Sequence, residues 1–242
     1  MHLLALDTST EACSAALGVC LPGEPERVLT RAAEAPRGHA ELILPMVESL
    51  LAEAGLSLSS LGAIAFARGP GSFTGLRLAA AVTQGLAFGA GLPVLAVSTL
   101  RASALQALQR APSATHVLVC NDARMGEVYV AAFARGAGGL PEPLGPESVC
   151  PPSSVVLPAT SGVWVGAGHG FRAYPQLEQA APASSRPGEA RPGFTEIFAD
   201  LLPQAREVLP LARAEWAAGR ILKPAEAQPV YLRDDVAKVP QG

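Results

Sequence analysis

The stretch Arg68-Gly69-Pro70-Gly71-Ser72-Phe73-Thr74-Gly75-Leu76-Arg77 connects an apolar run to a long alanine-rich segment. The run at residues 61–67 predicts a strand, and the segment at 74–90 predicts a helix that Ser72 or Thr74 caps. Glycines in such a loop allow two backbones to approach closely. The start of a helix behind a glycine loop can also hold an anion. Which of these two uses applies decides between an assembly protein and a nucleotide-binding one.

Regular elements are predicted on both sides of this loop. Before it lie three short strands and a helix, and after it a strand and a second helix. These elements cover residues 2–6, 12–19, 26–33, 39–54, 92–97 and 98–109. Three strands followed by alternating helices and strands indicate an α/β fold with a mixed sheet. The order resembles one domain of the actin-like ATPase (ASKHA) fold, which implies two domains, each with a mixed sheet flanked by helices.

The second half of the chain is less regular. We expect a turn at 121–126, a polar loop at 184–193 and a final extended segment at 229–234. Strands are predicted at 116–120, 127–134 and 163–166, and helices at 195–204 and 206–219. The predicted domains are an N-terminal actin-like domain at 1–108, a smaller C-terminal domain at 109–204, and a helix and tail at 205–242 that pack back on the first domain.

The composition favours a soluble protein with a large core. Of 242 residues, 49% are hydrophobic and 16% are charged, with a net charge of −3. No basic stripe is visible, which argues against autonomous nucleic-acid binding. The four cysteines form no CxxC pair, which is typical of reduced thiols. No signal peptide or membrane-spanning run is predicted, so we expect a cytoplasmic protein.

The first strand ends in a polar corner, Asp7-Thr8-Ser9-Thr10. In actin-like ATPases the corresponding corner lies near a metal-bound phosphate. A second glycine loop contains Gly166 and Gly168, so the possible nucleotide-binding residues are Asp7, Thr8, Ser9, Gly166 and Gly168. Kinase-type corners prefer glycine where Ser9 stands, and Asp-Thr-Ser is also a common turn cap. A stand-alone small-molecule kinase or ATPase remains the alternative function.

Catalytic and metal-binding patterns are weak. His39 stands near the start of a predicted helix, but the position that would share its face is occupied by Ile43. No Ser/His or Cys/His arrangement, phosphate-binding P-loop or zinc motif is visible. We therefore predict no catalytic residue, no metal site and no cofactor.

The helices at 39–54 and 74–90 carry apolar or small residues around more than one face. A helix that covers a sheet needs one apolar face, so the second face favours a partner. Deep burial within one large domain is the alternative. The predicted interface residues are Leu42, Pro45, Met46, Ser49, Arg77, Ala80, Ala81 and Gln84.

Five segments together resemble the TsaB (YeaZ) family. They are Asp7-Thr8-Ser9-Thr10, residues 39–51, residues 69–77, Asp122-Ala123-Arg124-Met125-Gly126-Glu127-Val128-Tyr129 and Pro229-Val230-Tyr231-Leu232-Arg233. The resemblance implies a subunit without catalysis of its own. Such a subunit supports its paralogue TsaD in threonylcarbamoyl transfer to the adenosine next to the anticodon of tRNA (t6A). It also implies the ATPase TsaE as a further partner, tRNA contact only within the complex, and a homodimer when alone.

The segment at 98–106 separates this chain from the catalytic paralogue. TsaD-like proteins carry two histidines four residues apart on the corresponding helix. Here the segment reads Ser98-Thr99-Leu100-Arg101-Ala102-Ser103-Ala104-Leu105-Gln106, without histidine, cysteine or carboxylate. The resemblance therefore favours the non-catalytic member of the pair.

Overall fold

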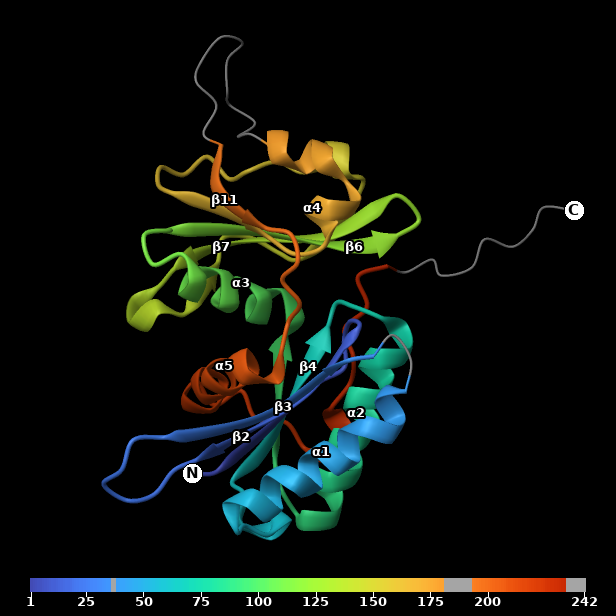
Figure 1. Ribbon diagram of the computed structural model, residues 1–242, viewed down its shortest axis with the longest axis vertical. Coiled ribbons are helices and arrows are strands. Elements are labelled where there is room, and N and C mark those ends of the chain that lie inside the picture. Colours follow the sequence, from blue (N-terminus) through green and yellow to red (C-terminus); the bar gives the residue numbers. More distant parts are fainter. Residues whose placement is uncertain (36–37, 181–192, 234–242) are drawn as a thin grey trace, which may run out of the picture.

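The computed structural model describes residues 1–35, 38–180 and 193–233. The chain forms two lobes, each built on one sheet, and they are stacked along the long axis of the molecule (Figure 1). None of the helices in these ranges is long and apolar enough to cross a membrane. The two mixed sheets with flanking helices confirm the predicted α/β fold class.

The first sheet has the order β3-β2-β1-β4-β5. Its strands are β1 Leu3–Asp7, β2 Ala12–Val19, β3 Arg27–Glu34, β4 Ala63–Gly69 and β5 Val94–Ser98. The first three strands form an antiparallel meander, while β4 runs parallel to β1 and β5 parallel to β4. β1 and β2 are buried along their whole length, because helices cover both faces of the sheet.

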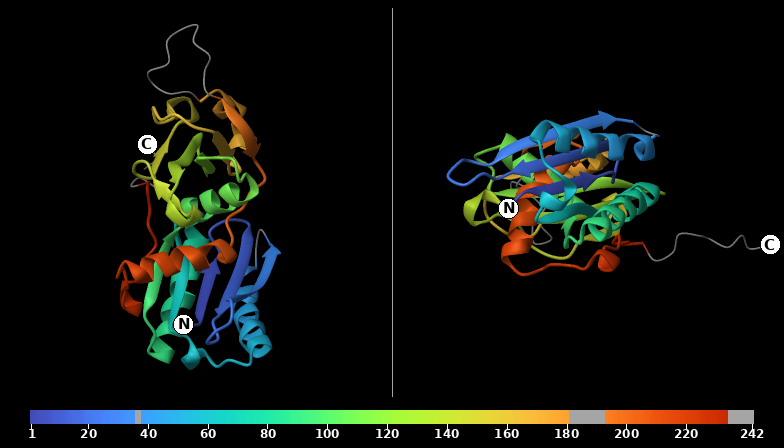
Figure 2. Two further views of the ribbon diagram at one scale, coloured as in Figure 1. Left: turned by 90° about the vertical axis from the view of Figure 1, so that its left-hand side faces the viewer. Right: turned by 90° about the horizontal axis from the view of Figure 1, so that it is seen from below.

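Helices α1 (His39–Ala54) and α2 (Phe73–Ala90) cover one face of this sheet. Helix α5 (Ala205–Ala217) comes from the C-terminal part of the chain and covers the opposite face (Figure 2). Its apolar side chains Val208, Leu209 and Leu211 pack there, and its first amide, at Ala205, donates a 2.9 Å hydrogen bond to Ser14 Oγ on β2. The first lobe is therefore completed by residues distant in sequence.

The second sheet has the order β11-β10-β6-β7-β8, and β9 also pairs with β7. Its strands are β6 His116–Arg124, β7 Glu127–Arg135, β8 Pro141–Pro143, β9 Ser148–Cys150, β10 Trp164–Ala167 and β11 Phe194–Phe198. The short helix α4 (Gly170–Ala173) packs with Trp164 on one face. Short 3₁₀ turns lie at Leu58–Ser60, Ala137–Gly139, Pro152–Ser154, Pro175–Gln179 and Pro224–Glu226.

Helix α3 (Thr99–Arg110) lies between the two sheets. Ala102 and Leu105 pack in the core of the first lobe, whereas Leu100 and Ala104 pack in the core of the second. Because it is buried on both sides, α3 forms a layer that the two lobes share. The predicted boundary at residue 108 therefore falls inside a helix that serves both lobes.

The prediction of a helix at 195–204 is wrong. The structure has β11 (Phe194–Phe198) in its place, paired in parallel with β10, and the next helix begins only at Ala205. The Phe194 ring packs edge-on against Phe171 at 5.4 Å between centroids, and Ile197 joins the same core cluster. Tertiary packing thus overrides local pattern. β6 also extends to Arg124, further than predicted, and most of the loop predicted at 184–193 lies outside the described residues.

Candidate functional site

The glycine loop brings two backbones of the first lobe into close contact. A side-chain Cβ at Gly75 would lie 1.9 Å from the carbonyl oxygen of Thr8, and one at Gly71 would lie 2.5 Å from the carbonyl oxygen of Ser9. No other residue type fits at these distances without movement of the backbone. Of the two uses considered for the loop, the structure supports close backbone approach.

Hydrogen bonds join the loop to the corner that follows β1. The Ser72 amide donates to the Ser9 carbonyl at 2.7 Å, and Thr8 Oγ1 donates to the Gly75 carbonyl at 2.7 Å. Ser72 caps α2 by accepting a 3.5 Å hydrogen bond from the Gly75 amide, as predicted. These bonds engage donors that a phosphate group would need.

Asp7 is fully buried at the end of β1. Its Oδ1 accepts a 2.8 Å hydrogen bond from the Ser9 amide, and within the described residues its Oδ2 has no partner. Desolvation raises the pKa of Asp7 from 3.8 to about 6, against the opposing effect of that hydrogen bond. Burial thus makes the charged form less favourable than in water, although a carboxyl group with this pKa is still mostly ionised at neutral pH.

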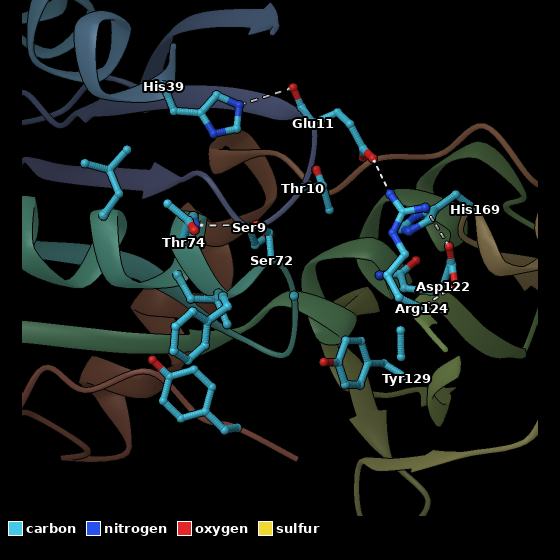
Figure 3. A pocket seen from close by; sticks show the side chains of 18 of the residues that line it. Ser9, Thr10, Glu11, His39, Ser72, Thr74, Asp122, Arg124, Tyr129 and His169 are labelled. Carbon is cyan, nitrogen blue, oxygen red and sulfur yellow. Dashed lines mark hydrogen bonds and ion pairs between the residues drawn. The ribbon is translucent and has the colours of Figure 1, made fainter. Parts of the chain in front are cut away.

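A cavity of about 780 Å³ lies between the lobes (Figure 3). Its wall includes the β1 corner, the start of α1 and the start of α2. The second lobe contributes the β6–β7 hairpin and His169, and the chain after α5 contributes residues 230–233. The cavity is therefore built from both lobes and closed partly by the tail.

Three polar atoms of cavity-lining residues have no hydrogen-bond partner within the described residues. They are Ser9 Oγ, Asn121 Oδ1 and His169 Nδ1. Ser9 and Asn121 are almost completely buried. Burial lowers the pKa of His169, which favours a neutral imidazole. These atoms can accept or exchange hydrogen bonds with water or a small polar molecule.

The predicted nucleotide-binding residues are not assembled into one cradle. Ser9 lines the cavity, whereas Asp7, Thr8, Gly166 and Gly168 are absent from its lining. A Cβ at Gly166 would lie 2.8 Å from the Phe171 ring, and one at Gly168 would lie 2.3 Å from Asn121 Oδ1. These two glycines therefore serve packing within the second lobe.

Ion pairs connect charged side chains at the cavity mouth. The Arg124 guanidinium lies 3.5 Å from Glu11 and 3.1 Å from Asp122, which joins the two lobes through one side chain (Figure 3). His39 Nε2 lies 3.4 Å from the Glu11 carbonyl oxygen. In the described part of the chain, no three His, Cys, Asp or Glu residues gather closely enough to hold a metal ion.

The predicted interface residues occupy different depths on α1 and α2. Pro45, Ser49, Arg77 and Ala81 are exposed, and Leu42, Met46 and Gln84 are half-buried. Ala80 is only 4% exposed and belongs to the core beneath α2, so it presents little surface to a partner. Its neighbour Ala81 points outward, because successive helix positions lie about 100° apart.

Sequence reasoning missed several exposed apolar side chains beside this face. Leu44 on α1 and Phe73 and Phe88 on α2 are exposed, Phe88 at 82%. The spacing of Ala81, Gly85 and Phe88 at i, i+4 and i+7 could have placed them on one stripe. That pattern was obscured by the small residues around the helix.

Known proteins resemble this chain over nearly its whole length. The family model described as TsaD, tRNA N6-adenosine threonylcarbamoyltransferase, matches residues 31–165. The tRNA threonylcarbamoyladenosine biosynthesis protein TsaB of Escherichia coli is 41% identical, with 98% of this chain and 96% of that protein covered. The protein of the same name from Haemophilus influenzae is 38% identical, with coverage of 98% and 95%.

The solved structure of YeaZ from Pseudomonas aeruginosa has the same fold. It superposes with a TM-score of 0.82 at 44% identity, covering 96% of this chain and 99% of the other. With this coverage the match includes both lobes. The chain therefore belongs to the TsaB family.

Proposed function

We propose that this protein acts in the biosynthesis of threonylcarbamoyladenosine on tRNA as a non-catalytic partner subunit of TsaD. Relatives that align over nearly the full chain are named for this pathway. The observation that carries the proposal is the exposed face of α1 and α2 (Pro45, Ser49, Ala81, Gly85 and Phe88), which we call the helix face.

The helix face combines small and apolar residues that are exposed in the described part of the chain. A Cβ at Gly85 would meet no atom within 4 Å among the described residues, so this chain's own packing does not require glycine there. Glycine in mid-helix costs about 1 kcal/mol relative to alanine. A small residue at an open position is explained by a second helix that approaches closely, because short side chains reduce the distance between helix axes.

The described residues contain no complete catalytic arrangement, which is consistent with a non-catalytic role. Helix α3 contributes Ala102 and Leu105 to the core of the first lobe and other buried side chains to that of the second, and none of its residues is His, Cys, Asp or Glu. At the cavity mouth, the Arg124 guanidinium forms ion pairs with both Glu11 and Asp122. In this proposal TsaD supplies the chemistry and TsaE joins the assembly. We place tRNA contact within the complex, a homodimer on the helix face when TsaD is absent, and the whole in the cytoplasm.

The alternative of a stand-alone kinase or ATPase has less support. Of the two glycine loops, one packs against the β1 corner and the other against Phe171 and Asn121. Isothermal calorimetry with Mg-ATP on the isolated chain tests this alternative, and tight binding with turnover would favour it.

The test of the helix face is Ala81→Glu, with Ala217→Glu on α5 as the matched exposed control. Size-exclusion chromatography with TsaD and reconstituted tRNA modification are the two readouts. We expect Ala81→Glu to weaken complex formation at least about tenfold, since an unpaired charge would be buried at the contact. Ala217→Glu should behave like the unmodified protein.

Reconstitution without this chain gives the complementary measurement. We expect little tRNA modification from TsaD and TsaE alone, and recovery when this chain is added. A full yield in its absence, or an undiminished complex with Ala81→Glu, would contradict the proposal.

A further inference from the structure

The seven residues 227–233, which we call the clasp, run along the cavity from the first lobe to the second. Figure 1 shows this part of the chain, in red, rising past α2 towards the end of β6. Residues 230–233 line the cavity, together with Ser9, Asn121 and others. The clasp is thus a wall of the cavity as well as a connection between the lobes.

The first half of the clasp is fixed to the first lobe. Gln84 Nε2 on α2 donates a 2.9 Å hydrogen bond to the Ala227 carbonyl, and the Val230 amide donates one of 2.8 Å to the Arg68 carbonyl. Gly69 makes room for this approach, since a Cβ there would lie 2.9 Å from the Val230 carbonyl oxygen. Backbone and side chain together hold the segment against the glycine loop.

Tyr231 forms the middle attachment. Its ring lies 5.4 Å from that of Phe73, and its hydroxyl accepts a 3.1 Å hydrogen bond from Arg77 Nε. The Arg77 guanidinium also lies 3.8 Å from the centre of the Phe73 ring. An aromatic pair with a cation above it restrains the tyrosine at the start of α2.

The far end of the clasp is fixed to the second lobe. The Arg233 guanidinium forms an ion pair with Glu127 and donates a 3.3 Å hydrogen bond to the Arg124 carbonyl. It also contacts Met125 Sδ at 3.5 Å. Its side chain is only 18% exposed, so these charge-assisted contacts are partly shielded from water.

Arg233 attaches to a hairpin tip with an unusual backbone. Arg124, Met125 and Gly126 have φ values of 62°, 57° and 80°, all in the left-handed region. Two successive non-glycine residues in this region persist only where their surroundings hold them. Asp122 accepts a hydrogen bond from the Arg124 amide at 2.8 Å, and Arg233 holds the carbonyl of the same residue.

We propose that the clasp fixes the angle between the two lobes and that its release opens the cavity. Helix α3 lies between the lobes and is packed against both, and Glu147 bonds to Arg68 and Ser98. These contacts do not by themselves prevent the two lobes from rotating about α3. The rotation is therefore limited at the cavity mouth. The clasp and the Arg124–Glu11 ion pair both restrict this rotation, and most of the bonds that restrict it belong to the clasp.

The clasp also connects the cavity with the helix face. Phe73 and Arg77 hold Tyr231 from the first two turns of α2, the helix that carries Ala81 and Phe88. If a partner covers α2 as in the proposed function, its contact with Arg77 changes the hold on Tyr231. This coupling rests on the proposed function, whereas the clasp itself is tested on the isolated chain.

The experiment compares hydrogen exchange and small-angle X-ray scattering of the full chain with those of Arg233→Ala and Tyr231→Ala. Arg172→Ala is the matched control, because Arg172 pairs with Asp200 inside the second lobe. We expect Arg233→Ala to accelerate exchange at residues 124–130 about tenfold, since a charge-assisted, part-buried attachment is lost. The radius of gyration should increase in both clasp variants, and exchange in α5 should stay unchanged.

A charge exchange distinguishes the attachment from a general loss of stability. The double variant Glu127→Arg, Arg233→Glu should restore most of the protection that Arg233→Glu alone removes. Wild-type exchange and scattering in both clasp variants would overturn the inference. So would acceleration spread evenly over both lobes that the double variant does not reverse. Neither result depends on TsaD, so the outcome is separate from that of the helix-face test.

Discussion

The glycines of α2 have different neighbours. Gly75 meets the Thr8 carbonyl, whereas Gly85 and Gly89 face open space among the described residues. The first is required by the fold of this chain, and the other two are not. The sequence shows that the helix contains many small residues, but not which of them the fold of this chain requires.

Gly75→Ala should destabilise the protein, while Gly89→Ala should not. The added methyl at position 75 would lie 1.9 Å from a backbone oxygen, so we expect a loss of about 3 kcal/mol in the free energy of unfolding. At position 89 the methyl meets nothing, and the gain should be about 0.5–1 kcal/mol from reduced backbone entropy. Urea unfolding measures both, and equal effects would contradict the assigned contact.

Asp7 should make stability depend on pH. Its pKa is raised from 3.8 to about 6 by burial, so between these values the folded state holds a proton that the unfolded state has lost. Stability therefore falls as pH rises through this window. Asp7→Asn removes the effect, and its stability relative to the wild type should rise by up to about 3 kcal/mol from pH 4 to pH 7.

Urea unfolding of both proteins at pH 4, 5, 6 and 7 measures this difference. The comparison cancels contributions from groups that do not interact with Asp7, such as His169, whose pKa is lowered by burial. A difference between wild type and Asp7→Asn that is constant with pH would show that Asp7 is not buried as described.

Helix α3 shows how an element can depend on one distant side chain. The Arg135 guanidinium, at the end of β7, donates hydrogen bonds of 2.8, 2.9 and 2.8 Å to the carbonyls of Leu108, Ala111 and Ala114. These carbonyls lie at and beyond the C-terminal end of α3, where helix carbonyls lack partners. Arg135 thereby ties the shared layer to the second sheet.

Arg135→Ala should lower the free energy of unfolding by about 2–3 kcal/mol, because three carbonyls lose a charged donor. Arg135→Lys should recover little, since one ammonium cannot reproduce the planar arrangement of donors. Arg110→Ala is the control: Arg110 lies 5.9 Å from the centre of the Phe198 ring, and its loss should cost less than about 1 kcal/mol. Full recovery by lysine would argue against the capping geometry.

Elements with a strong periodic pattern could be predicted from the sequence. The helix at 39–54 has the predicted bounds, and α2 begins one residue earlier than expected. β11 could not be predicted, because Phe194 and Ile197 become strand residues only through packing on β10 and Phe171. Short apolar segments carry too little local information to decide their state.

The arrangement of the whole molecule depends on contacts between distant segments. The corner at Asp7 and the glycine loop are recognisable in the sequence, but their mutual contact required the structure. The same holds for Arg233, which meets the hairpin tip more than 100 residues away. The cavity could be located only approximately, because its wall combines both lobes and the clasp.

Helix α5 determines whether the first lobe can exist alone. The sheet face beneath it is made of small and apolar residues, including Ala5, Ala65 and Leu95, which would be exposed to water without the helix. Burial of such a face contributes about 25 cal/mol per Å² of apolar area. A fragment of residues 1–111 should therefore bind a hydrophobic dye and unfold without a cooperative transition.

The same fragment joined to residues 203–226 through a flexible Gly/Ser linker should fold cooperatively. In this fragment α5 again covers the sheet, and the Ala205 amide again donates its hydrogen bond to Ser14 Oγ. Both fragments expose the second side of α3, so the difference between them reports on α5. Circular dichroism during urea unfolding and the dispersion of amide resonances provide the measurement. A sharp transition in the shorter fragment would mean that the first lobe is stable without its C-terminal helix, and that α5 serves the contact between lobes instead.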